Sequence, residues 1–197
     1  MTHRDHIRAS LAEAARTLDA LLADERALAA VDDFVSAACR TLRAGGRLLT
    51  CGNGGSMCDA MHFAEEWTGR FRADRPALAA LCFSDPSHLT CIANDFGFEE
   101  VFARQVQAQG RAGDLLVAIS TSGNSENILR ACAAARALDI TVVGLLGNGG
   151  GKQSDVVDIP IVVPGQLSSD RVQEIHIKIL HTVIEAAERE LFPELYG

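Results

Sequence analysis

Aromatic residues and long apolar runs are both scarce in this chain of 197 residues, which has one Trp and one Tyr. No stretch approaches the roughly 18 uncharged apolar residues of a membrane span, and the N-terminus lacks the apolar core of a secretion signal. Hydrophobic residues still make up 48% of the chain, which indicates a packed core rather than disorder. We therefore expect one domain over residues 1–197, located in the cytoplasm and without membrane contact.

Clustered positive charge is also missing. The formal net charge is -8, and no group of Lys and Arg exceeds a few residues, so a nucleic-acid partner is disfavoured. The six cysteines form no C-x-x-C pair and are expected to be reduced and mostly buried. Cys51 and Cys58 flank a glycine loop, where a nucleophile is conceivable, but with no basic neighbour in sequence both are expected to be packing residues.

Nucleotide-binding loops are absent as well. The run 52–57 lacks the third glycine of G-x-G-x-x-G, and the run 147–152 lacks both the first Gly of a phosphate-binding P-loop and the Ser or Thr after its Lys. The glycines of 147–151 are therefore expected to form a flexible turn.

The elements that are present alternate between strands and helices. Two helical patterns, over 7–22 and 28–42, precede apolar strand candidates at 47–51, 78–83, 115–119, 141–146 and 159–163. Further helices are expected at 98–109, 125–138 and 169–191. This order predicts an α/β fold with a parallel sheet covered by helices on both faces, whose ligands bind at the carboxyl ends of the strands.

A glycine loop follows the first strand. Gly52, Gly54 and Gly55 precede a helix, and Ser56 with Asp59 has the form of a capping box, so backbone N–H groups are expected to face an anion above the helix start. His62 and Glu66 are four residues apart and therefore leave the same face of this helix. A polar ligand site and a metal or acid–base pair are expected on one helix.

A second loop follows the strand at 115–119 and opens a helix. Ser120, Thr121, Ser122 and Ser125 place four hydroxyl groups at this helix N-terminus, a pattern that suits a phosphate without any lysine. An ordinary Ser-rich capping loop has the same composition. The presence of the first loop favours the phosphate interpretation.

The last helix carries Gln173, His176 and His181. Residues 173 and 181 are about 12 Å apart along a helix, whereas 173 and 176 are one turn apart, so spacing does not choose between the two histidines. One of them with His62 and Glu66 would suit Zn²⁺ or a similar ion. Asn94 and Asp95, expected in a loop, could contact a sugar or simply form a turn. His88 shows no partner and is expected at the surface.

The ordered set C-G-N-G-G-S, D-A-x-H-F-A-E-E, N-D-F-G, S-T-S-G-N-S and Q-E-x-H-x-x-x-x-H over residues 51–181 resembles the phosphoheptose isomerases of the SIS-domain superfamily. The resemblance implies a flavodoxin-like sheet of five parallel strands, a helical pair over 1–45, and a homotetramer with sites at subunit interfaces. It also implies one Zn²⁺ per subunit, bound by His62, Glu66, Gln173 and His181. The substrate contacts it implies are Asn53, Gly54, Gly55, Ser56, Glu66, Asn94, Asp95, Ser120, Thr121, Ser122, Ser125, Asp170 and Gln173.

The activity that the resemblance implies is interconversion of sedoheptulose 7-phosphate and D-glycero-D-manno-heptose 7-phosphate, for synthesis of the ADP-heptose of lipopolysaccharide. Glu66 would move a proton between C1 and C2 through an enediol, and His181 would move the hydroxyl protons. Two alternatives remain. One is a non-catalytic SIS protein that binds a sugar phosphate or a replication initiator. The other is an isomerase of hexose or pentose phosphates.

Overall fold

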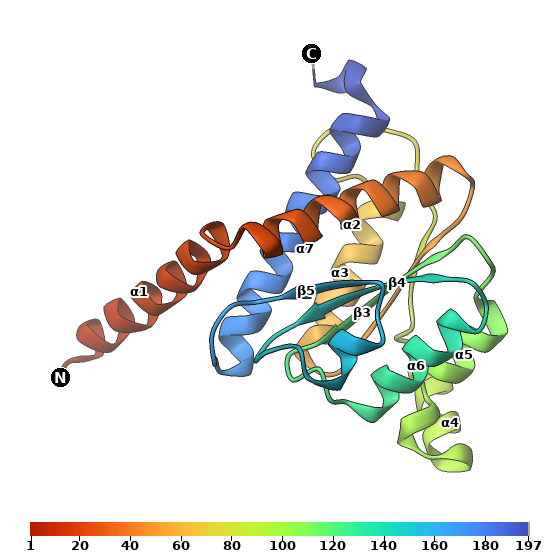
Figure 1. The fold of residues 1–197 in the computed structure, drawn as a ribbon, viewed down its shortest axis with the longest axis horizontal. Coiled ribbons are helices and arrows are strands. Elements are labelled where there is room, and N and C mark those ends of the chain that lie inside the picture. Colours follow the sequence, from red (N-terminus) through yellow and green to blue (C-terminus); the bar gives the residue numbers. More distant parts are fainter. Residues whose placement is uncertain (197) are drawn as a thin grey trace.

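Five parallel strands form the central sheet of the computed structural model, which describes residues 1–196 (Figure 1). The strands lie in the order β2-β1-β3-β4-β5. β1 and β3 are buried along their whole length, which explains why their residues form continuous apolar runs rather than alternating ones. Their bounds are β1 Leu48–Gly52, β2 Ala80–Cys82, β3 Leu115–Ser120, β4 Thr141–Leu146 and β5 Ile159–Val162.

Helices cover both faces of the sheet, as predicted. On one face α2, α3 and α7 pack against side chains such as Leu48 and Val117, and on the other α4, α5 and α6 pack against Leu49 and Leu116. The two apolar clusters alternate along each strand because successive side chains point to opposite faces. The helices span α2 Glu25–Arg43, α3 Gly55–Thr68, α4 Pro86–Phe96, α5 Ala103–Gln109, α6 Glu126–Arg136 and α7 Ser169–Leu191.

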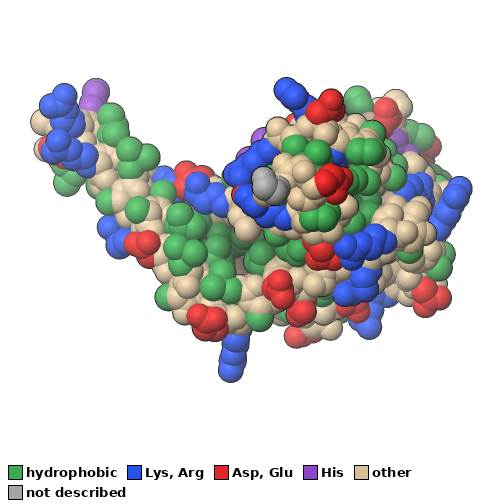
Figure 2. All heavy atoms as spheres, turned by 90° about the horizontal axis from the view of Figure 1, so that it is seen from above, with side chains coloured by type: hydrophobic (Ala, Val, Ile, Leu, Met, Phe, Trp, Pro, Cys, Tyr) green, Lys and Arg blue, Asp and Glu red, His purple; other side chains and the backbone are tan. Residues whose placement is uncertain are grey.

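The first helix, α1 His3–Leu22, projects away from the sheet and its helices (Figure 1). It starts at a capping box between Thr2 and Asp5, and it leaves Ile7 and Leu11 58% and 66% exposed. Figure 2 shows hydrophobic side chains along this arm and on the body next to it. Short 3-10 helices are η1 Phe98–Glu100, η2 Gly151–Asp155 and η3 Pro193–Leu195. Within residues 1–196, no helix has the length and apolar character needed to span a bilayer.

The neighbouring strands β1 and β3 mark the place where the chain changes direction across the sheet. From β1 it continues to β2 on one side, whereas β3 leads to β4 on the other. Gly52 pairs in register with Ile119, so the loops after these two strands leave the same edge side by side. In open α/β sheets of this order, ligands bind at this switch point.

Three local expectations were wrong, all of them near α4, a helix that was not predicted. Asp85 caps α4 by accepting the His88 N–H, and Pro86 occupies the first helical position, where proline is favoured. The predicted loop residues Asn94 and Asp95 therefore lie in the last turn of α4. His88 is half-buried and bonds to the Val101 carbonyl, and the expected helix over 98–109 divides into η1 and α5.

All six cysteines are free thiols in the structure. Cys39, Cys51 and Cys132 are buried, and burial raises the pKa of Cys132 to about 12. Cys58 is exposed, so the expectation that it packs in the core was wrong. It lies on the outer side of the first turn of α3.

Candidate active site

The loops after β1 and β3 share one cavity of about 290 Å³ at the carboxyl edge of the sheet. Eight predicted ligand residues line it, together with Ile119 and Ser169, which were not predicted. The eight are Asn53, Gly54, Gly55, Ser56, Ser120, Thr121, Ser125 and Gln173. Polar loops predicted separately from sequence thus form one surface.

Three helices begin at this cavity without a side-chain cap. The N-cap residues of α3, α6 and α7 are Gly54, Ser125 and Ser168, and none makes a capping hydrogen bond within residues 1–196. By contrast, Thr2, Asp24 and Asp85 cap α1, α2 and α4. The positive ends of three helix dipoles therefore converge where an anion can accept hydrogen bonds from the backbone.

The capping box predicted for Ser56 and Asp59 was wrong. α3 begins one residue earlier, at Gly55, so Ser56 lies inside the first turn and is itself buried. Asp59 Oδ2 is buried with no hydrogen-bond partner in residues 1–196, and burial raises the pKa of this carboxyl to about 6. The start of α3 consequently remains open to a ligand.

The glycine turn expected at 147–151 supports the serine loop. Gly123 has φ +63°, and a Cβ there would lie 1.9 Å from the Gly150 carbonyl oxygen, so only glycine fits this approach. The Lys152 N–H bonds to Asn124 Oδ1 and the Gln153 N–H bonds to the Gly123 carbonyl. The turn is therefore packed beneath the loop that presents the hydroxyl groups.

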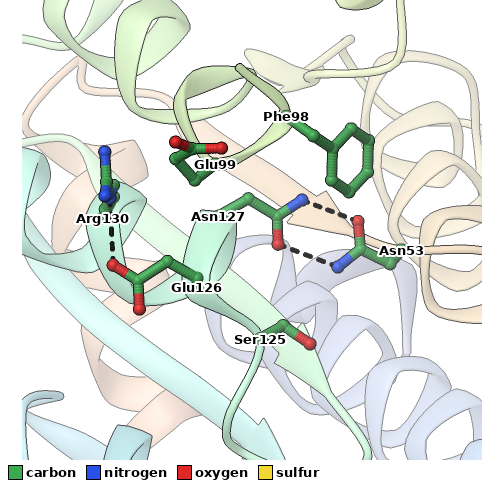
Figure 3. A pocket seen from close by; sticks show the side chains of 7 residues that line it. All are labelled: Asn53, Phe98, Glu99, Ser125, Glu126, Asn127 and Arg130. Carbon is green, nitrogen blue, oxygen red and sulfur yellow. Dashed lines mark hydrogen bonds and ion pairs between the residues drawn. The ribbon is translucent and has the colours of Figure 1, made fainter. Parts of the chain in front are cut away.

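A second cavity, of about 420 Å³, adjoins the first and shares Asn53 and Ser125 with it (Figure 3). Figure 3 shows the Asn53 and Asn127 side chains hydrogen-bonded to each other, with the ring of Phe98 above Asn53. Glu126 is ion-paired with Arg130 on the far side, 3.0 Å from its Nε. The wall between the two cavities is made by the Asn53 side chain and the start of α6.

His62, Glu66 and His181 converge where α3 and α7 lie against each other. Each offers one ligand atom, and these three atoms lie within 4.8 Å of one another. His62 Nε2 is 3.1 Å from Glu66 Oε1, and the two imidazole rings meet edge to face with centroids 4.9 Å apart. The predicted pairing of residues 62 and 66 on one helix face is confirmed.

The donors of this cluster are ones that zinc binds, and one pair of them has the spacing of tetrahedral zinc ligands. With bonds of about 2.0–2.1 Å, tetrahedral ligand atoms are about 3.3 Å apart, close to the His62–Glu66 separation. His181 Nε2 is buried and has no hydrogen-bond partner within residues 1–196, as expected of a ligand atom. Burial is the main cause that lowers the pKa of His181, and the neighbouring His62 lowers it further. A lower pKa favours the neutral imidazole that binds metal.

The choice that spacing left open between His176 and His181 is clear in the structure. His176 is fully buried on another side of α7, where its Nε2–H donates to the Leu146 carbonyl at 3.2 Å. His181 faces His62, with the ring of Phe71 5.6 Å away on its other side. The histidine of this cluster is His181.

Gln173 lines the first cavity, whereas four other predicted site residues lie apart from both the cavity and the cluster. The Gln173 side chain contacts Gly55 at the start of α3, where a Cβ on Gly55 would be 2.5 Å from its Oε1, and it is eight residues from His181. Ser122 is exposed and accepts the Asn124 N–H. Asn94, Asp95 and Asp170 are exposed and line neither of the two cavities.

Two residues of the site were missed. Ser169 accepts a hydrogen bond from Thr121 Oγ1 at 3.2 Å and lines the first cavity, a position that the polar run before the last helix could have indicated. Asn127 bonds to Asn53 across 74 positions of sequence, and its place in an Ala-rich helix carried no signal.

Comparison with known proteins agrees with this architecture. The family model of the SIS domain matches residues 11–147. Phosphoheptose isomerase of Sodalis glossinidius is 52% identical over 96% of this chain and 97% of its own, and that of Edwardsiella ictaluri is 51% identical over 96% and 98%. The structure of a phosphoheptose isomerase from Neisseria gonorrhoeae superposes with a TM-score of 0.88 at 38% identity, covering 95% of this chain and 99% of that one.

A second structure, a phosphoheptose isomerase from Francisella tularensis, has a TM-score of 0.89 at 32% identity and covers 96% of this chain and 100% of that one. The chain belongs to the phosphoheptose isomerases, a family of sugar-phosphate isomerases with the SIS domain.

Proposed function

We propose that this protein interconverts sedoheptulose 7-phosphate and D-glycero-D-manno-heptose 7-phosphate through an enediol. The observation that carries the proposal is that α3 and α7 each contribute to both sites. Their N-terminal ends line the cavity, and later turns of the same helices bring His62, Glu66 and His181 together. The same two helices thus carry an anion-binding cavity at their N-terminal ends and an acid–base cluster further along.

The separation of these two groups supports a seven-carbon substrate. Gly55 and His62 are seven residues apart on α3, which corresponds to about 10 Å along the axis. A heptose chain has six carbon–carbon bonds of about 1.5 Å, and with its phosphate ester it extends to roughly 10 Å. A pentose phosphate is shorter by two bonds, so its C1 and C2 would not reach the cluster while its phosphate occupies the cradle.

The residues that would hold zinc are His62, Glu66 and His181. The family resemblance implies Gln173 as a fourth ligand, but in this chain the Gln173 side chain lies against Gly55, at the other end of α3 from the cluster. The ion would polarise the sugar carbonyl and stabilise negative charge on its oxygen. Burial lowers the pKa of His181, which favours the neutral imidazole needed to bind a metal ion.

The proton transfers are assigned to residues of the cluster. Glu66 takes the proton from C1 of the ketose and returns it to C2, so the aldose forms without an external acid or base. His181 carries the proton from the C1 hydroxyl to the C2 oxygen, which turns the C1 hydroxyl into the aldehyde and the C2 carbonyl into a hydroxyl. No atoms are gained or lost in this isomerisation.

We also propose a homotetramer with active sites at subunit interfaces. The support is the α1 arm, whose Ile7, Leu11 and Leu22 are more than half exposed in a single chain. Exposed apolar side chains in a row along one helix are typical of a surface that another chain covers. Asn94, Asp95 and Asp170 are exposed at the surface, where such a neighbour could contact them.

The test is an assay of the purified protein with sedoheptulose 7-phosphate, fructose 6-phosphate and arabinose 5-phosphate, with aldose and ketose products separated by chromatography. We expect turnover of the heptulose and little of the shorter sugars. Glu66→Gln should lower kcat by about 10²–10⁴-fold, the usual loss for a general base. Glu65→Gln, at the neighbouring exposed carboxylate, is the matched control and should remain within a few-fold of wild type.

Turnover of Glu66→Gln within a few-fold of wild type would reject the role of this carboxylate. Absence of product from all three sugars would leave the sugar-phosphate-binding alternative. Metal analysis of protein purified without added ions tests the zinc assignment separately, with about one ion expected per chain.

A further inference from the structure

We propose that Asn127 is a positioning residue for substrate binding, which holds the Asn53 side chain and joins the two phosphate-facing loops. This inference rests on the proposed function, because it assigns a role to Asn53 in binding the sugar phosphate. It concerns a residue of α6 that has no contact with the His–Glu–His cluster, since α6 covers the opposite face of the sheet from α3 and α7.

The two amide side chains form a closed ring of hydrogen bonds (Figure 3). Asn53 Nδ2 donates to Asn127 Oδ1 at 2.9 Å, and Asn127 Nδ2 donates to Asn53 Oδ1 at the same distance. Asn127 is only 3% exposed, whereas Asn53 is half-buried and lines both cavities. The buried partner therefore supports the one that faces the ligand.

The ring leaves the Asn53 side chain able to make further hydrogen bonds to a ligand. A carboxamide has two N–H donors and two acceptor lone pairs on its oxygen, and the ring uses one of each. Because the ring engages both the nitrogen and the oxygen of the Asn53 amide, it sets the direction in which the remaining N–H and lone pair point. Without Asn127, the Asn53 side chain can rotate about χ2, whose energy wells are broad.

The ring also ties the loops together. Asn53 precedes α3, and Asn127 lies in the first turn of α6, two residues after its N-cap Ser125. Within residues 1–196, it is the only side-chain hydrogen bonding between residues 52–56 and residues 120–127. The uncapped N-termini of α3 and α6 consequently keep a fixed separation, which an anion bridging them requires.

A role confined to binding predicts a particular kinetic pattern. Loss of Asn127 weakens the hold on the phosphoryl end but leaves the cluster that transfers protons unchanged. We expect Asn127→Ala to raise KM and the Kd for inorganic phosphate by about tenfold, as two lost hydrogen bonds near a ligand would do. The value of kcat and the metal content should remain within about threefold of wild type.

The decisive experiment is a double-mutant cycle with Asn53→Ala, Asn127→Ala and the double variant. Phosphate affinity is measured by titration calorimetry and KM by turnover of sedoheptulose 7-phosphate. If Asn127 acts through Asn53, the second substitution adds nothing to Asn53→Ala. Gln105→Ala is the control, because Gln105 is a buried amide of α5 that bonds to Gln109 of the same helix. It should lower the melting temperature without changing KM or phosphate affinity.

Two results would overturn the proposal: an unchanged phosphate affinity in Asn127→Ala, or a full additional loss when Asn127→Ala is combined with Asn53→Ala. Asn127→Ser replaces Asn127→Ala in the cycle if the alanine variant fails to fold. The phosphate titration does not depend on turnover, so it tests Asn127 even if the wild-type protein isomerises none of the sugars, which would reject the proposed function alone.

Discussion

Two histidines of α7 show how position on a helix decides the chemistry of a side chain. Residues 176 and 181 are five apart, about 140° around the axis. His176 therefore points into the core, where burial lowers its pKa to about 4, and His181 points toward α3. The neutral His176 donates its Nε2–H to Leu146 at the end of β4, while its Nδ1 is buried without a partner in residues 1–196.

This burial predicts a loss of stability in mild acid. Between about pH 6.5 and pH 4, the unfolded chain binds a proton at His176 and the native state does not, so the free energy of unfolding falls as the pH falls. Above pH 6.5 both states are neutral and the contribution is constant. The full difference is on the order of 3 kcal/mol.

The measurement is urea unfolding at several pH values between 7 and 4.5 for wild type and His176→Gln, whose amide can still donate to Leu146. As the pH falls, wild type should lose more stability than the variant. Comparing the two proteins cancels the contribution of other titrating groups, such as Asp59, because both proteins contain them. Parallel stability curves for the two proteins would contradict the assignment.

At the scale of elements, α3 and α7 lie side by side and run in the same direction. Gly55 meets Gln173 at their starts, and Glu66 meets His181 further along. At the end of α3, Arg75 donates to the carbonyls of Glu66 and Trp67 at 2.7 Å and pairs with Glu188 of α7, both side chains being fully buried. This last contact holds the two helices in the register that the cluster needs.

We expect Arg75→Met to leave the Glu188 carboxylate buried without a cation, with only the Tyr196 hydroxyl as its partner, and to cost about 3–5 kcal/mol of stability. Adding Glu188→Leu should restore much of that stability but not the hydrogen bonds of Arg75 to the end of α3, so the affinity for the proposed zinc ion should stay weaker than in wild type. Thermal unfolding and competition with a chromogenic chelator measure the two effects. Arg43→Met is the control, because its pair with Glu190 is exposed and worth at most about 1 kcal/mol. Wild-type zinc affinity in the double variant would refute this role.

Periodicity and turn residues predicted most of these elements because the signals are local. The strand at 141–146 and the helix at 169–191 match the structure at both ends, since apolar runs and flanking Gly or Ser mark them. α4 was missed because Pro86 indicates a turn as readily as a helix start. The contacts of Asn127 and Arg75 join residues 74 and 113 positions apart, and no local pattern reports such pairings.

At the scale of the whole molecule, the α1 arm has more apolar surface than a single chain can bury. It contacts the body through Arg171, which bonds to Ser10, and leaves Ile7 and Leu11 on an open side. Burying a Leu side chain at a subunit contact contributes roughly 1.5–3 kcal/mol. Several such side chains along one helix are sufficient to favour self-association.

Leu11→Glu should therefore shift the protein toward smaller assemblies at micromolar concentration, as measured by sedimentation velocity. The wild-type reference is the proposed tetramer of 21.0 kDa chains. Ala9→Glu adds the same charge about 160° away around α1 and is expected to have a smaller effect. A wild-type protein that sediments as a monomer would reject the tetramer.

The first cavity has no lysine or arginine among the described residues that line it, and the chain carries a net charge of -8. In the proposed function, partial charges at helix ends would hold the phosphoryl group against a repulsive field from the whole protein. Reactant and product of an isomerisation carry the same phosphoryl group, and a permanent cationic clamp would retain both equally. In the proposed isomerase, backbone dipoles would bind both sugars less tightly than a cationic site, so each sugar can leave after a single conversion in either direction.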